Sequence, residues 1–232
     1  MSMLELEHVS KSYGRLGEHV ALRDVSLSIE AGEMIVVWGM RRSGRSTLLR
    51  IAGGIEQPDT GLARFAGHEL GDCPGEPLGD GIGYVRRGFS PSEGQLVIDH
   101  LVIGLIARGV PLSIAASRAR AALERTEMLH CATLRPSELD CAESVRAAIA
   151  RALAFSPKLL LIDEPTIGVD LLARDGILLL LQSLAQEGMA ILTSTGESTD
   201  LSGARALTLS EGELYGQVTR ELGTVVPIRR RA

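Results

Sequence analysis

Lysine is nearly absent from this chain of 232 residues: Lys11 and Lys158 are the only lysines among its 24 basic residues. The formal net charge is -5 and the pI about 5.6, so the composition lacks the domain-wide basic surface of nucleic-acid-binding proteins. The one basic run, Arg229–Arg231, is typical of a solvated tail. We therefore expect no nucleic-acid partner.

Cysteine and long apolar runs are also scarce. The three cysteines, Cys73, Cys131 and Cys141, are odd in number and have no metal-ligand spacing, which argues against a disulfide framework and fits a reducing cytoplasm. Residues 1–10 have no basic region followed by an apolar segment, so we expect no secretory signal. The longest apolar runs, such as Ile177–Leu181, are too short to cross a bilayer. If the protein acts at a membrane, another chain must supply the span.

The sequence does contain apolar runs typical of buried strands, and these alternate with helical patterns. Continuous apolar runs predict buried parallel strands, and two early segments that alternate apolar and polar residues predict half-exposed strands. The buried strands are expected at residues 34–38, 159–162, 190–192 and 206–209, and the half-exposed ones at 4–9 and 25–29. Such a series predicts an α/β fold with a mainly parallel sheet and an antiparallel portion near the N-terminus.

Helical patterns are expected at residues 46–52, 142–154 and 171–186. Residues from about 96 to 155 are rich in helical patterns and interrupt the strand series. We therefore predict one domain over residues 1–232, with a core at about 1–95 and 156–232 and a helical subdomain at about 96–155.

A glycine-bounded loop follows the strand at 34–38 and opens a helix, which is the setting of a phosphate-binding P-loop. Its pattern is G-x-x-x-x-G-K-[ST], with Arg45 in the lysine position. The hydroxyl of Ser46 would bind Mg²⁺. A turn that starts a helix and binds nothing is the alternative. The candidate nucleotide-binding residues of this loop are Gly39, Arg41, Arg42, Ser43, Gly44, Arg45, Ser46 and Thr47.

Two carboxylates end the apolar strand 159–162, as in a Walker B strand: Asp163 and Glu164. Asp163 would hold Mg²⁺, and Glu164 would orient and polarise the attacking water. Two acids at a strand end are often plain surface residues. Here they follow a buried strand and come after a P-loop in the order that a P-loop NTPase core requires.

Together these motifs resemble the ABC ATPase family over about residues 3 to 217. The resemblance implies that Tyr13, in an aromatic A-loop, stacks on adenine, and that Asp170 belongs to a D-loop. It further implies that residues 145–153 form the helix after the ABC signature. It also implies ATP and Mg²⁺ as ligands, and a dimer in which two cassettes enclose two ATP molecules head to tail.

Several positions depart from the family pattern. The family signature is Leu-Ser-Gly-Gly-Gln/Glu, whose serine and glycine amides contact the γ-phosphate of ATP on the opposite subunit. Its five positions here are Leu139, Asp140, Cys141, Ala142 and Glu143. The first and last match the pattern, whereas Asp140 brings a carboxylate and Cys141 and Ala142 bring Cβ atoms where glycine allows a close approach. Arg87 replaces the Q-loop glutamine, Thr195 the switch histidine and Arg42 a P-loop glycine. A carboxylate at Asp140 would repel phosphate. A planar guanidinium at Arg45 does not act as a point charge between β- and γ-phosphates. Drift is the alternative explanation, but the changes together favour weakened hydrolysis.

The run 51–61 is similar to a subfamily that contains lipoprotein-release, macrolide-export and cell-division ATPases. The resemblance implies an integral-membrane transporter subunit as partner, a homodimer or a heterodimer with a second cassette, and a place on the cytoplasmic face of the cell membrane. The expected function is ATP binding with weak hydrolysis by a transporter subunit. The alternative is an inactive pseudo-ATPase that acts as a scaffold or regulator. A soluble translation or repair factor is disfavoured, because such proteins usually carry two cassettes or long coiled-coil insertions.

Overall fold

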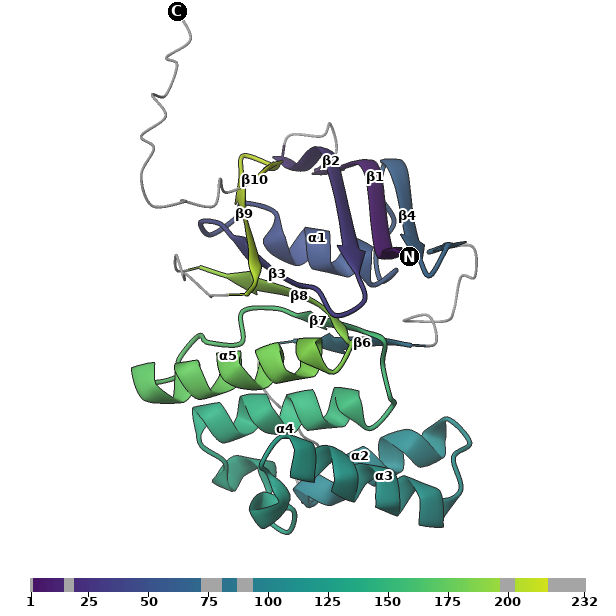
Figure 1. Ribbon diagram of the computed structural model, residues 1–232, viewed down its shortest axis with the longest axis vertical. Helices are drawn as coiled ribbons and strands as arrows, with labels where there is room; N and C mark the ends of the chain where they lie inside the picture. Colours follow the sequence, from purple (N-terminus) through teal and green to yellow (C-terminus); the bar gives the residue numbers. More distant parts are fainter. Residues whose placement is uncertain (1, 15–18, 72–80, 87–93, 197–202, 217–232) are drawn as a thin grey trace, which may run out of the picture.

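The computed structural model describes residues 2–14, 19–71, 81–86, 94–196 and 203–216. Two sheets and a group of helices form its layers (Figure 1). The strands are β1 Ser2–Tyr13, β2 His19–Glu30, β3 Met34–Trp38, β4 Thr60–Phe65, β5 His68–Glu69, β6 Ile82–Val85, β7 Leu159–Ile162, β8 Ala190–Thr195, β9 Arg205–Ser210 and β10 Glu213–Gly216. The helices are α1 Arg45–Ala52, α2 Val97–Ala107, α3 Leu112–Arg125, α4 Cys141–Leu153 and α5 Leu171–Gln186, with short 3₁₀ turns η1 Leu129–Cys131 and η2 Pro136–Glu138.

The first sheet is antiparallel, in the order β2-β1-β4-β5. The second has the order β10-β9-β3-β8-β7-β6, and all its neighbours are parallel except β10 and β9. The predicted α/β class, the mainly parallel sheet and the antiparallel N-terminal portion are therefore confirmed.

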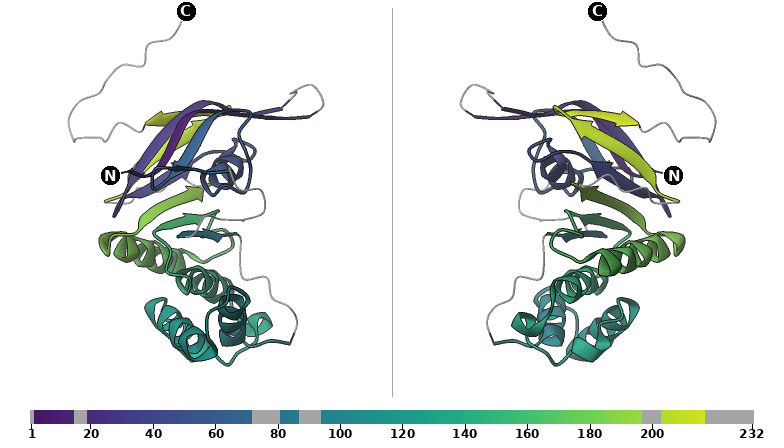
Figure 2. Two further views of the ribbon diagram at one scale, coloured as in Figure 1. Left: turned by 90° about the vertical axis from the view of Figure 1, so that its right-hand side faces the viewer. Right: turned by 90° about the vertical axis from the view of Figure 1, so that its left-hand side faces the viewer.

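The central strands are buried on both faces, which explains their continuous apolar sequence. In β3, Ile35 and Val37 pack in the core that contains α1 and the antiparallel sheet. Met34 and Val36 pack in the core on the other face, with the helices. Figure 1 shows α1 between the two sheets and α5 and α4 beyond the second sheet, and Figure 2 shows the same layers from two sides.

Helices α2, α3 and α4 lie within the segment where a helical subdomain was predicted, and α2 and α3 lie farthest from the antiparallel sheet (Figure 2). Leu101, Leu105 and Leu123 are fully buried among them. A helical subdomain is confirmed, whereas its boundaries at about 96 and 155 remain a prediction. Within the described ranges, no helix combines the length and apolarity needed to cross a bilayer.

Candidate nucleotide-binding site

The loop between β3 and α1 has a backbone that only glycine fits at both ends. Gly44 precedes α1 with a φ of 103°, and a Cβ atom there would lie 2.0 Å from the carbonyl oxygen of Ala21. A Cβ atom on Gly39 would lie 2.4 Å from Oγ of Ser43 and 2.6 Å from the carbonyl oxygen of Leu209. All three distances are too short for a real side chain, so packing alone requires glycine at these two positions.

Arg42 shows the opposite relation between residue and backbone. Its φ is 68°, in the left-handed region that disfavours residues with a Cβ atom. The family resemblance placed a glycine here, and the backbone retains the conformation that glycine prefers. The side chain of Arg42 is exposed, so the substitution changes backbone strain and charge without filling the core.

A pocket of about 870 Å³ opens over this loop. Its lining joins parts of the chain that are far apart in sequence: Tyr13, His19, Ala21, the loop residues 41–47 and Glu164. Oγ of Ser43 and Nη1 of Arg45 are buried there without a hydrogen-bond partner among the residues that the structure describes. Buried polar atoms are normally paired. Together with the start of α1, they fit an anionic ligand such as a phosphate chain.

The predicted Walker B carboxylate lies directly against the residue that replaces the P-loop lysine. Nη2 of Arg45 donates a hydrogen bond of 2.7 Å to Oε1 of Glu164. The side chains of Arg45 and Glu164 are only 6% and 7% exposed, so water screens the pair weakly. From the sequence we expected the positive charge of Arg45 to lie near the phosphates. In the structure its guanidinium instead donates to Glu164, the candidate catalytic residue.

The side chain of Ser194 in β8 contacts both acidic residues at the end of β7. Oγ of Ser194 donates to Oδ1 of Asp163 at 2.7 Å and accepts from the backbone N–H of Glu164 at 3.0 Å. Glu164 adopts a left-handed backbone with a φ of 52°, a strained conformation that often occurs at functional sites. Burial and the charge of Asp163 raise the pKa of Tyr84 to about 12, so its phenol stays neutral.

The predicted switch residue is close to the same pair. Thr195 ends β8, is buried, and its carbonyl oxygen accepts from the N–H of Gly39 at 3.2 Å. A Cβ atom placed on Gly196 would lie 3.6 Å from Nη1 of Arg45 and 3.9 Å from Oε1 of Glu164. The ends of β3, β7 and β8 thus bring the three predicted motifs to one edge of the sheet.

A hydrogen-bond network holds Tyr13 at the pocket rim. Its hydroxyl donates to Oε1 of Glu56 at 2.6 Å, accepts from Nη2 of Arg50 at 2.9 Å and lies 3.1 Å from Oγ1 of Thr47. Burial opposes ionisation of Glu56, but hydrogen bonds from Tyr13 and Arg50 lower the pKa of its carboxyl below the ordinary value. The network ties the first strand to the first turns of α1.

The residues at the signature position lie outside this pocket. Asp140 caps α4 reciprocally with Glu143: Oδ1 of Asp140 accepts from the N–H of Glu143 at 2.8 Å, and Oε2 of Glu143 accepts from the N–H of Asp140 at 2.9 Å. Leu139 and Ala142 are half-buried and Cys141 is exposed. A separate hollow of about 250 Å³ lies between the segment 139–145, Ile167 and Glu164.

The remaining predicted residues are placed as follows. Asp170 caps α5 by accepting from the N–H of Ala173 at 3.0 Å. Ser46 is half-buried in the pocket lining, and Asp163, at the end of β7, is half-buried and accepts from Ser194. Arg87 lies outside the described residues.

The sequence analysis did not identify His19, Ala21 and Ser194 as part of the site. Ser194 carried a signal, because it directly precedes Thr195, two residues after the end of the strand predicted at 190–192. His19 and Ala21 carried none, since they reach the pocket only through the pairing of β2 with β1.

Comparison with known proteins agrees with this geometry. The model of the ABC transporter family matches residues 22–167. The chain is 35% identical to the cell division ATP-binding protein FtsE of Escherichia coli (strain K12), over 94% of this chain and 100% of FtsE. It is 36% identical to the lipoprotein-releasing system ATP-binding protein LolD of Geobacter metallireducens, over 76% of this chain and 80% of LolD.

A solved structure has the same fold. The dimeric post-hydrolysis structure of the ATP-binding cassette MJ0796, bound to ADP and Pi, superposes with a TM-score of 0.79 at 30% identity, over 91% of this chain and 96% of that one. The fold, the pocket and the matches lead to one conclusion: the chain belongs to the ABC transporter family and is an ATP-binding cassette similar to FtsE and LolD.

Proposed function

We propose that this cassette binds Mg-ATP in the pocket over the loop 39–47 and hydrolyses it slowly. The observation that carries the proposal is the buried ion pair between Arg45 and Glu164. A cassette needs a cation at the phosphates and a carboxylate free to orient water, and here these two groups neutralise each other.

In the proposed complex, the phosphates lie on the backbone amides at the start of α1, where the helix dipole favours negative charge. Oγ of Ser43 and Nη1 of Arg45, both buried and unpaired, are the side-chain donors available to them. The hydroxyl of Tyr13 is already bonded to Glu56, so its ring would contact the base. Ser46 and Asp163 would hold Mg²⁺, which supplies charge neutralisation at the phosphate oxygens when bound.

Slow chemistry follows from either position of Arg45. If the guanidinium stays on Glu164, the phosphates lose a cation, and Oε1 of the carboxylate accepts from Arg45 instead of from the attacking water. If the guanidinium moves to the phosphates, binding must first break a buried ion pair. Thr195 adds to the effect, because a threonine hydroxyl carries no charge to the phosphates.

The signature position weakens the second half of a head-to-tail dimer. Asp140 places a carboxylate at the start of α4, where the family resemblance implies contact with the phosphates of the opposite subunit. One chain therefore carries changes on both sides of the site. Pairing with an intact cassette would not restore one complete site.

We also propose an integral-membrane partner, bound at the cytoplasmic face through a groove between the core and the helical subdomain. The family membership supports this proposal, together with exposed apolar side chains such as Ile103 and Ile106 on α2. We expect an integral-membrane protein to co-purify in mild detergent. Purification from membranes without any such protein would contradict the proposal.

Steady-state phosphate release by the complex purified from membranes tests the slow turnover. We expect a rate at least about tenfold below that of an intact cassette, equivalent to about 1.4 kcal/mol of barrier. Arg45→Lys with Thr195→His should recover little, and adding Asp140→Ser, Cys141→Gly and Ala142→Gly should be needed.

Rapid wild-type turnover that Glu164→Gln abolishes would refute the proposal. An absence of binding at millimolar Mg-ATP would instead favour an inactive scaffold or regulator.

A further inference from the structure

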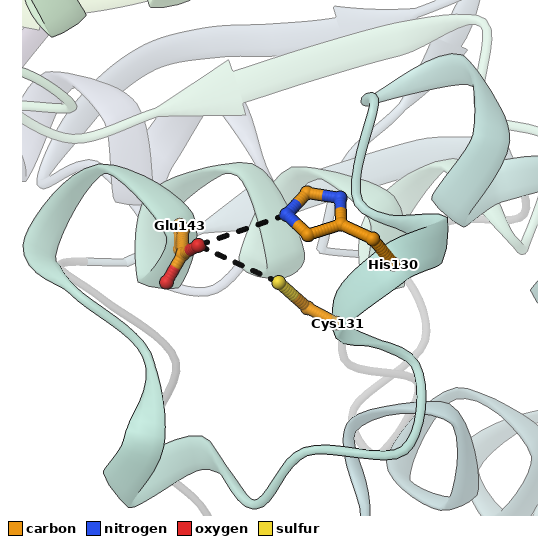
Figure 3. Close-up of side chains that lie close together, drawn as sticks. All are labelled: His130, Cys131 and Glu143. Atoms are coloured by element: carbon orange, nitrogen blue, oxygen red, sulfur yellow. Dashed lines mark hydrogen bonds and ion pairs between the residues drawn. The ribbon is translucent and has the colours of Figure 1, made fainter.

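Three metal-binding side chains meet beside the signature position, away from the nucleotide pocket. His130 and Cys131 belong to η1, and Glu143 to the first turn of α4. One ligand atom from each lies within 4.8 Å of the other two. Figure 3 shows the imidazole and the thiol pointing to the same carboxylate oxygen.

The spacing of the atoms is near that of a zinc shell. Sγ of Cys131 lies 3.5 Å from Oε1 of Glu143, and Nε2 of His130 lies 3.7 Å from the same oxygen. Tetrahedral zinc with bonds of about 2.0 Å to nitrogen and oxygen and 2.3 Å to sulfur separates its ligand atoms by roughly 3.3–3.6 Å. The third pair, Nε2 of His130 and Sγ of Cys131, lies within 4.8 Å. Cys131 is buried, whereas His130 is exposed, so binding of the metal would require its imidazole to move toward the thiol.

The carboxylate is already oriented for a single-oxygen contact. Oε2 of Glu143 accepts the backbone N–H of Asp140 at 2.9 Å, which turns Oε1 toward Cys131 and His130. Hydrogen bonds of this kind commonly hold metal ligands in place. The reciprocal cap of α4 thus gives Glu143 a fixed geometry as well as a role in the helix start.

We propose that His130, Cys131 and Glu143 form a binding site for Zn²⁺ that fastens η1 to the first turn of α4. Thiolate, imidazole and carboxylate together suit zinc, and a thiolate disfavours Mg²⁺ and Ca²⁺. Three protein ligands leave the fourth position to water. Zinc binding is independent of the nucleotide pocket, so its test is distinct from that of the proposed function.

Zinc titration of the full-length, reduced, metal-stripped protein without nucleotide tests the site. A chromophoric chelator in competition reports affinity, and Co²⁺ reports thiolate ligation by its charge-transfer absorption. We expect one Zn²⁺ per chain at this site, unaffected by millimolar Mg²⁺, and a higher melting temperature with zinc, because the metal binds the folded chain.

His130→Gln and Cys131→Ser should each weaken zinc binding by at least about tenfold, and Cys131→Ser should remove the cobalt band. Cys141→Ser is the matched control, since Cys141 is exposed near the same turn and has no place in the cluster; it should keep wild-type affinity and the cobalt band. His130→Gln alters an exposed side chain, so the test does not depend on how Cys131→Ser folds. An absence of zinc binding in the wild type, unchanged binding in His130→Gln, or loss of binding in Cys141→Ser would overturn the proposal.

Discussion

The Arg45–Glu164 pair predicts that removing the catalytic candidate strengthens nucleotide binding. In Glu164→Gln, the guanidinium of Arg45 loses its counter-charge while the shape of residue 164 is kept. Both side chains are less than a tenth exposed and their atoms are 2.7 Å apart. Loss of one partner from such a buried pair costs about 3–5 kcal/mol. Because the pocket borders the pair, we expect a value near the lower limit, about 3 kcal/mol, for the loss in free energy of unfolding.

Phosphates supply the missing negative charge, so the variant should regain part of that energy when it binds nucleotide. A gain of about 1.4–3 kcal/mol corresponds to roughly tenfold to hundredfold tighter binding. The assay is calorimetric titration with ADP and with a non-hydrolysable ATP analogue, which separates affinity from blocked hydrolysis.

A double-mutant cycle identifies the pair as the cause. In an Arg45→Met background, Glu164→Gln should raise stability, because it removes a carboxylate that has already lost its buried partner, and the gain in affinity should be smaller than in the wild type, because no guanidinium is left for the phosphates to compensate. An equal change in both backgrounds, or no gain in affinity in the wild-type background, would refute the reasoning.

Three further predictions concern single positions. Arg42→Gly should raise the free energy of unfolding by about 0.5–1 kcal/mol, because relief of about 1–2 kcal/mol of left-handed strain exceeds the entropy cost of glycine; Arg41→Gly, where φ is not positive, should lower it. Asp140→Ala should lower the melting temperature through the loss of a helix cap, a cost of about 1 kcal/mol, while Asp140→Ser should keep most of it; equal effects of the two would contradict the capping role. Burial and the nearby carboxylate raise the pKa of the Cys131 thiol to about 11, so at pH 8 alkylation mapped by mass spectrometry should modify exposed Cys141 first and reach Cys131 only as pH rises toward 11.

Many of the strands and helices could be predicted from the sequence, because the patterns that indicate them lie within short stretches of the chain. The apolar runs of β3 and β7 and the period of α5 were predicted within a residue or two of their observed bounds. Short strands such as β5 and β10 escaped, since two to four residues carry little pattern. The cap formed by Asp140 and Glu143 has a readable acid-x-x-acid spacing but was interpreted only as a changed signature.

The side-chain contacts of the candidate sites could not be predicted from the sequence. Arg45 and Glu164 are separated by 119 positions, and their meeting depends on how β3, β8 and β7 are ordered in one sheet. The sequence placed both residues at the same site but could not indicate that the guanidinium lies on the carboxylate. The cluster at Cys131 likewise depends on the approach of η1 to α4, which no spacing rule predicts.

The carbonyl oxygen of Ala21 offers a reason, other than ATP binding, for a cassette to keep the second glycine of its P-loop, Gly44. It lies where a side chain on Gly44 would be, and a Cβ atom on Gly212 would lie 3.2 Å from it. Selection for a folded chain is therefore enough to keep the glycine of a P-loop, even in a lineage that no longer uses ATP. The presence of Gly39 and Gly44 therefore reflects common ancestry and packing, and does not by itself indicate activity. Residue 45 differs, because its side chain lines the pocket and pairs with Glu164, so a change there alters the site directly.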